Sequence, residues 1–222
     1  MPLPEKTRNI ALASLGVAAL IVILLLIRMA LESENAVVIL HQRDLDPPTE
    51  TWILDGGGPD VELAPGAADG WAYWTIADKG DGHAWYTRNL TERDLSHEGG
   101  WQVRVRAAVA EPPEGPGCAV GVQISDGRDR WSLCFGEDGL YHEGPQGPVL
   151  LAELDVRVFR EYRLIYDPAA EVVSIAADNV VLKTLSRPDA ADDTAGTIRF
   201  GSFSDPARSV SNWGLVEFVG KF

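Results

Sequence analysis

An uninterrupted apolar run near the amino terminus restricts the folding of this chain more than any other feature. From Ile10 to Ile27, all 18 residues are apolar or small. As a helix this run would be about 27 Å long, close to the hydrocarbon thickness of a bilayer. Signal cleavage after Ala30 or Ala36 is disfavoured, because Arg28 or Glu34 would occupy the minus-three position. We therefore expect an uncleaved transmembrane helix over residues 10–31.

The charges around this run predict its orientation. Lys6 and Arg8 lie on its amino-terminal side, and Arg28 lies at its far end. The positive-inside rule favours a short cytoplasmic tail over residues 1–9, so the remainder would be periplasmic or extracellular, beyond a cell (inner) membrane crossed once. Small side chains in the run would let a second membrane helix approach closely. These residues are Ala11, Ser14, Gly16, Ala18 and Ala19.

The rest of the chain reads as one acidic domain behind a linker. The net charge of −14 would repel nucleic acid and anionic lipid headgroups, so we expect no nucleic-acid partner. Pro47 and Pro48 end any preceding helix, so residues 32–51 are predicted as a linker and residues 52–222 as the domain. Within the linker, Val37–Leu40 either extends the helix or forms a first strand.

Hydrophobic alternation predicts that this domain is built from strands. Trp101, Val103, Val105, Ala107 and Val109 alternate with polar residues, including Arg104 and Arg106, which marks a half-buried strand. Similar segments, separated by turn signals, occupy 71–76, 84–88, 118–125, 130–136, 139–143, 158–166, 171–177, 179–185, 196–202 and 213–219. This pattern predicts an all-β fold, a two-sheet antiparallel jelly-roll sandwich behind one amino-terminal helix.

One hairpin can be assigned a register, and the register bears on the two cysteines. A turn centred on Gly127-Arg128 pairs Ile124 with Trp131, Val122 with Leu133 and Val120 with Phe135, and all six would point into the core. If the alternation continues, Cys118 lies on the face of Val120, whereas Cys134 lies on the opposite face. We therefore expect two buried free thiols and no disulfide.

The order of the strand sequences resembles the concanavalin A-like superfamily, which includes laminin-G-like and sialidase lectin-like jelly rolls. The resemblance covers residues 52–219 and concerns pattern, without a signature motif, so it implies a fold more than a function. The segments that carry it are Trp101–Val109, GVQISDGRDRWSLCFGEDGLY (121–141), FREYRLIYDP (159–168), VVSIAADNVVL (172–182), IRFGSFS (198–204) and NWGLVEF (212–218).

The resemblance raises the question of glycoside hydrolysis and of calcium. Some members of the superfamily carry an E-x-D-x-x-E strand, but here Glu153 and Asp155 are followed by Val158 in place of the acid/base glutamate. We expect no enzyme activity, no catalytic residue and no cofactor. Calcium, which laminin-G-like domains often bind, stays open, because acidic loops offer oxygen ligands. These are Asp126, Asp129, Glu137, Asp138, Asp189, Asp192 and Asp193.

Aromatic residues between positions 71 and 86 form the candidate binding surface. Trp71 and Tyr73 share one face of a strand, Trp74 faces the opposite way, and Trp85 and Tyr86 follow in the next strand. An exposed aromatic face would suit sugar stacking or protein contact, whereas the alternative is that most of these rings pack in the core.

Three functions compete on this basis. Without a catalytic set, we favour a non-enzymatic accessory subunit that docks on partner proteins of a larger membrane complex, while its helix packs in the bilayer. A photosynthetic reaction-centre or antenna assembly is one such complex, and transport and respiratory complexes are equally compatible. The alternatives are a lectin-like carbohydrate-binding module at the cell surface and a degenerate glycoside hydrolase.

Overall fold

The computed structural model describes residues 37–68, 70–80, 83–91, 94, 99–115, 117–144, 146–186, 196–203 and 208–220. The expected cytoplasmic tail, the expected transmembrane helix and its small residues Ala11, Ser14, Gly16, Ala18 and Ala19 lie outside this set. Within it, no helix has the length and apolarity needed to cross a membrane.

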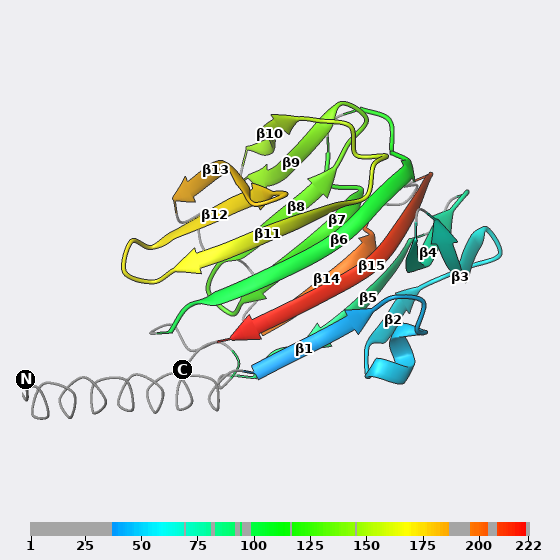
Figure 1. The fold of residues 1–222 in the computed structure, drawn as a ribbon, viewed down its shortest axis with the longest axis horizontal. Helices are drawn as coiled ribbons and strands as arrows, with labels where there is room; N and C mark the ends of the chain where they lie inside the picture. Colours follow the sequence, from blue (N-terminus) through cyan, green and yellow to red (C-terminus); the bar gives the residue numbers. More distant parts are fainter. Residues whose placement is uncertain are drawn as a thin grey trace, which may run out of the picture. The chain divides into compact units, whose positions relative to one another are not determined.

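The described residues form fifteen strands in two antiparallel sheets, as the alternating pattern predicts (Figure 1). The first sheet has the order β13–β12–β11–β6–β15–β4–β3, and β1 also pairs with β15. Its strands are β1 (Val37–Gln42), β3 (Val61–Ala68), β4 (Trp71–Asp78), β6 (Trp101–Glu111), β11 (Arg160–Asp167), β12 (Val172–Ala177), β13 (Val180–Ser186) and β15 (Ser209–Gly220).

The second sheet has the order β10–β9–β8–β7–β14–β5–β2. Its strands are β2 (Ile53–Gly56), β5 (Ala84–Asn89), β7 (Val120–Asp126), β8 (Arg130–Phe135), β9 (Gly139–Gly144), β10 (Gly147–Glu153) and β14 (Gly196–Ser202). A single turn of 3₁₀ helix, η1 (Pro47–Glu50), lies between β1 and β2. The architecture is thus the predicted all-β sandwich.

Side chains from the inner faces of the two sheets form one core. In β6, Trp101, Val103, Val105 and Val109 are buried as the alternation predicts. From the second sheet, residues of β7, β8 and β14 complete the same cluster, and Figure 1 shows β7 and β14 behind β6 and β15. Burial of these aliphatic and aromatic side chains supplies the main stabilisation of the fold.

Strand β1 corrects the predicted linker boundary. Residues 37–42 pair with Gly220–Leu215 of β15, and the side chains of Ile39 and His41 are buried. The first strand of the sandwich therefore lies inside the predicted linker 32–51, and the alternative of a strand over Val37–Leu40 is the one that the structure adopts.

The β7–β8 hairpin has the predicted register but not the predicted thiols. Ile124 pairs with Trp131 and Val122 with Leu133, and all six predicted core residues are fully buried. The expectation of free thiols is wrong, because Cys118 and Cys134 form a disulfide with Cα atoms 4.8 Å apart. Since β7 begins only at Val120, Cys118 precedes the strand, and the strand alternation does not set the direction of its side chain.

Candidate binding groove

A break in the pairing of β15 creates a groove on the outer face of the first sheet. One edge of β15 pairs with β4 over Ser209–Trp213 and with β1 over Leu215–Gly220. The carboxyl end of β1 and the amino end of β4 therefore meet at Gly214, which neither strand pairs in the ladder. The Arg43 amide fills part of this gap by donating a hydrogen bond of 2.8 Å to the Gly214 carbonyl.

A β-bulge at Gly214 decides which side chains face the groove. The register of β15 against β6 shifts between Trp213 and Leu215. Because of this extra residue, Trp213, Val216 and Phe218 all belong to the core, whereas Leu215 lines the groove and Glu217 pairs with Arg104 on the outer face. Without the bulge, Trp213 and Leu215 would lie on the same face.

The strand register places charged side chains in two rows across this outer face. Gln42, Leu215, Arg106 and Glu161 are consecutive partners on β1, β15, β6 and β11. Two residues along, the row consists of Glu217, Arg104 and Arg163. Directly paired residues point to the same side of a sheet, so the arginines and glutamates of the two rows share one surface.

Ion pairs link neighbouring strands within each row, and the pair of Glu161 with Arg163 joins the two rows. Arg104 Nε lies 3.0 Å from Glu217 Oε2, and Arg106 Nη2 lies 3.3 Å from Glu161 Oε2. Glu161 also accepts a hydrogen bond of 2.9 Å from Arg163 Nε. Burial alone would raise the pKa of Glu161, but Arg163, Arg104 and Arg106 outweigh it and hold that pKa below its ordinary value. Glu161 is therefore ionised at neutral pH.

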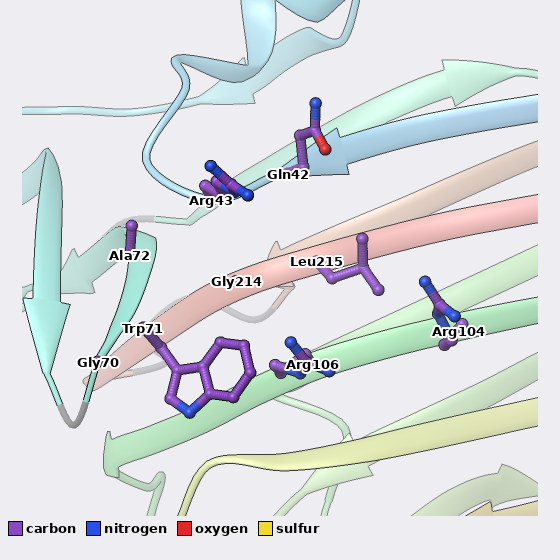
Figure 2. A pocket seen from close by; sticks show the side chains of 9 residues that line it. All are labelled: Gln42, Arg43, Gly70, Trp71, Ala72, Arg104, Arg106, Gly214 and Leu215. Atoms are coloured by element: carbon purple, nitrogen blue, oxygen red, sulfur yellow. The ribbon is translucent and has the colours of Figure 1, made fainter.

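The groove has a volume of about 430 Å³, and its lining includes three arginines and one tryptophan (Figure 2). The Arg106 guanidinium carbon lies 4.1 Å from the centroid of the Trp71 ring, a cation–π arrangement that orients both side chains. Trp71 stays 45% exposed. The lining consists of Gln42, Arg43, Gly70, Trp71, Ala72, Arg104, Arg106, Gly214 and Leu215. Its volume falls in the range of small-molecule sites.

The structure divides the five predicted aromatic residues among three places. Trp71 lines the groove, and Tyr73 lies on the same face, packed against Phe159 at 5.4 Å between ring centroids. Trp74 and Tyr86 are buried in the core, where Trp74 Nε1 donates a 3.1 Å hydrogen bond to the Tyr86 hydroxyl. Burial raises the pKa of Tyr86 to about 12.

Trp85 lies on the opposite sheet, so the five rings do not form one surface. It belongs to β5, between the buried residues Ala84 and Tyr86, and is half-buried on the outer face of the second sheet. Its ring stacks on His83 with a centroid separation of 4.4 Å. Only Trp71 and Tyr73 of the predicted set therefore belong to the region of the groove.

The acidic residues considered for catalysis or calcium lie elsewhere. Glu153 ends β10, and Asp155 is exposed in the following loop beside Arg157. Asp126 Oδ1 accepts hydrogen bonds from the Arg128 and Asp129 amides in the β7–β8 turn. Among the described residues, no group of three or more His, Cys, Asp or Glu side chains is arranged to hold a metal ion. Asp189, Asp192 and Asp193 lie outside the described residues.

The sequence pattern contains a signal for the groove in its charged residues as well as in its aromatic ones. Arg104 and Arg106 are adjacent outward positions of β6, and Glu161 and Arg163 have the same spacing in β11. Charged side chains on an outward strand face are ordinary, so the spacing by itself does not indicate a site. Arg43 carries no signal, because it lies within residues 32–51, which the sequence predicts as a linker.

Comparison with known proteins supports the fold alone. No family model matches the chain, and no curated protein matches it. Among solved structures, a carbohydrate esterase of the Shiga toxin-encoding bacteriophage phi24B is similar, with a TM-score of 0.55 and 7% identity over 76% of this chain and 90% of that chain. A protein of unknown function from Shewanella oneidensis MR-1 has a TM-score of 0.55 and 14% identity over 84% of this chain and 87% of that chain.

A third similar structure is a sialidase, with a TM-score of 0.54 and 10% identity. The match covers 81% of this chain and 18% of the sialidase chain. The described part of the chain thus has a β-sandwich fold similar to that of these proteins and of the binding domain of botulinum neurotoxin DC.

Proposed function

We propose that this chain is a non-enzymatic binding protein that holds a saccharide in the groove beside Trp71. The observation that carries the proposal is a 45% exposed tryptophan, held in place by Arg106, at the wall of a groove of about 430 Å³. An aromatic wall with a few convergent polar groups is the usual composition of a small-ligand site. The names of two proteins of similar fold, an esterase and a sialidase, refer to carbohydrates.

The ion pairs of the glutamates beside the groove support a binding role over hydrolysis. Hydrolysis of a glycosidic bond uses two carboxyl groups that flank the scissile bond. Glu161 and Glu217, which pair with the lining residues Arg106 and Arg104, are each engaged by arginine. Arginine pairing keeps Glu161 ionised, so it has no proton to donate to a leaving group.

A glycan array tests this proposal with the full chain in detergent. We expect wild type to bind a subset of glycans and Trp71→Ala to lose that binding. Trp85→Ala is the matched control, because it removes a half-buried tryptophan from the opposite sheet. Thermal unfolding of both variants would exclude loss of fold. The proposal is wrong if wild type binds no glycan, or if Trp71→Ala binds as wild type does.

We further propose that residues 10–31 anchor the binding domain in the cell membrane, with the domain outside the cytoplasm. The uninterrupted apolar run supports the anchor, and the charges around it support the orientation. Alkaline carbonate extraction of cell membranes should leave the chain in the pellet, whereas a chain without residues 1–31 should be released. Recovery of the full chain in the soluble fraction would contradict the anchor.

A second candidate is the accessory subunit of a membrane complex, favoured by exposed aliphatic side chains at one side of the sandwich. β10 and β13, which end their respective sheets, contact each other. Val149, Leu150, Val180 and Val181 of these strands are between 40% and 64% exposed. Purification in mild detergent would recover stoichiometric partners under this candidate, and Val180→Lys together with Val181→Lys would reduce their recovery.

A further inference from the structure

We infer that the ligand of the groove is an acidic saccharide, whose carboxylate or sulfate group is bound by Arg43. This inference rests on the proposed saccharide-binding function and adds the chemical class of the ligand. It depends on three observations: an excess of positive charge in the groove, an arginine without a carboxylate partner, and the backbone conformation that places this arginine at the gap in the sheet.

The charge in the groove is opposite to the charge of the protein. Three arginines, Arg43, Arg104 and Arg106, and no acidic residue line the groove, and two of these arginines pair with glutamates beside it. The whole chain carries a net charge of −14. Because salt screens charges beyond about 10 Å, the local excess determines the attraction at contact distance.

Arg43 is the arginine whose charge is available to a ligand. Arg104 and Arg106 each have a glutamate within ion-pair distance. Within the described part of the chain, no carboxylate forms an ion pair or hydrogen bond with the Arg43 side chain, although Asp44 follows it directly. The guanidinium group offers planar pairs of N–H donors that match a carboxylate or sulfate.

The backbone at Arg43 is held in a conformation that an arginine rarely adopts. Its φ is 63°, in the left-handed region, which costs a residue other than glycine about 1 kcal/mol or more. The hydrogen bond from its amide to the Gly214 carbonyl holds it at the gap between β1 and β4. A glycine would fit this backbone with less strain, so the fold does not require arginine here.

Trp71 makes a saccharide a better fit than a bare inorganic anion. A bare anion would need the arginines alone, whereas the groove also presents the exposed indole of Trp71 and the side chain of Leu215. A ligand with both an apolar ring face and an anionic group would use both kinds of surface. Figure 2 shows Trp71 and Arg106 on one side of the groove floor at Gly214 and Leu215, with Arg43 on the other.

The test measures binding of matched oligosaccharides to the full chain in uncharged detergent. The probes are a uronic acid-containing oligosaccharide, the same compound with its carboxyl groups reduced to alcohols, and a sulfated oligosaccharide. We expect an acidic probe to bind at least about 10-fold more tightly than the reduced probe, since one charge-assisted hydrogen-bonded pair contributes about this much. Comparing the affinities of the uronic acid-containing and sulfated probes identifies whether the groove prefers a carboxylate or a sulfate group.

Three variants separate the role of Arg43 from a structural role. Arg43→Gln should lose about 10-fold in affinity for the acidic probe and little for the reduced probe. Arg43→Gly should lose the same preference while unfolding at an equal or higher temperature, because glycine relieves the backbone strain. Arg157→Gln, which removes an exposed arginine paired with Asp155, is the control and should bind as wild type does.

The outcomes distinguish this inference from the proposed function. If neutral and acidic probes bind equally, or if Arg43→Gln retains the preference, the acidic-ligand inference is overturned while saccharide binding stands. If no oligosaccharide binds, both the acidic-ligand inference and the proposed saccharide binding are overturned. Binding of an acidic peptide alone would count as this outcome. Raising NaCl from about 50 mM to about 500 mM should weaken binding of the acidic probe more than binding of the reduced probe.

Discussion

At the scale of single residues, two buried histidines give the fold a defined pH dependence. Burial lowers the pKa of His41 below its ordinary value of 6.5, although Glu50, 2.7 Å from Nδ1, acts in the opposite direction. Burial also lowers the pKa of His142, against the effect of its contact with the Ser132 backbone. In the unfolded chain both imidazoles would take up protons near their ordinary pKa.

The stability of the sandwich should therefore fall as the pH decreases below about 6.5. Protonation favours the unfolded chain, because the folded pKa of each histidine is the lower one, so their full contribution is present only above the unfolded pKa. Urea midpoints at about pH 7.5, 6.5 and 5.5 would measure the loss, and His142→Asn should make the dependence shallower. A midpoint that stays constant or rises towards pH 5.5 would contradict the assignment.

Two strand glycines of similar sequence context should respond differently to substitution by alanine. A Cβ at Gly201 would clash with the Ala84 carbonyl and lie 2.9 Å from Trp85 Cα, and its φ is 132°. At Gly214 the nearest atom to a Cβ would be the Ala72 carbonyl oxygen at 3.5 Å, an ordinary contact. Gly201→Ala should cost more than about 2 kcal/mol, and Gly214→Ala less than about 1 kcal/mol, in the free energy of unfolding.

Chemical denaturation of the two variants side by side tests this difference. Gly214→Ala also narrows the floor of the groove, so its ligand affinity should fall while its stability is retained. Equal loss of stability in the two variants would show that the bulge at Gly214 tolerates no side chain, and the groove floor would then be a structural requirement of the fold.

At the scale of elements, the disulfide closes the β7–β8 hairpin near its open end. The two cysteines are separated by 16 residues, and a cross-link over a loop of this size stabilises by about 3 kcal/mol in the chain-entropy model. Replacing both cysteines with serine should lower the free energy of unfolding by that order. Intact mass should rise by two hydrogens on reduction, whereas two titratable thiols in the unreduced chain would contradict the disulfide.

The strands that sequence patterns missed lie at or near sheet edges. β3 ends the first sheet and contains Pro65, while β2 and β10 end the second sheet. An edge strand has one unpaired side, so it tolerates proline and does not need regular alternation. The central strands β6, β7 and β8 are constrained on both sides and were predicted well, including the register of the hairpin.

At the scale of the whole molecule, the boundary of the folded domain should lie before β1. A chain that begins at Val37 should fold cooperatively, because Val37–Lys221 forms a compact unit with its own internal contacts. A chain that begins at Trp52 would expose the edge of β15 that β1 covers, and Trp52 Nε1 would lose its 3.2 Å hydrogen bond to the Leu40 carbonyl. We expect this shorter chain to melt at a lower temperature.

Differential scanning calorimetry of the two truncated chains would measure the contribution of β1. The matched control is the chain from Val37 with Val38→Ala, because Val38 is 56% exposed and its loss should change the melting temperature little. Equal melting temperatures for the chains beginning at Val37 and Trp52 would contradict this prediction and show that residues 37–51 act only as a linker.

The sequence by itself determined the fold class, the central strands and the inward face of β6, because burial imposes a two-residue period on any half-buried strand. The same alternation assigned Arg104 and Arg106 to the outward face. The apolar run from Ile10 to Ile27 likewise carries the membrane hypothesis without help from the structure.

Only the tertiary structure decided what those outward arginines are near. The order of strands in a sheet is set by long-range pairing, so nothing local in the sequence places β6 beside β15 or ends β1 and β4 at the same glycine. The disulfide and the separation of Trp71 from Trp85 depend on where strands begin and which sheet they join. The groove exists because β1 and β4 share one edge of β15 and neither strand pairs with Gly214.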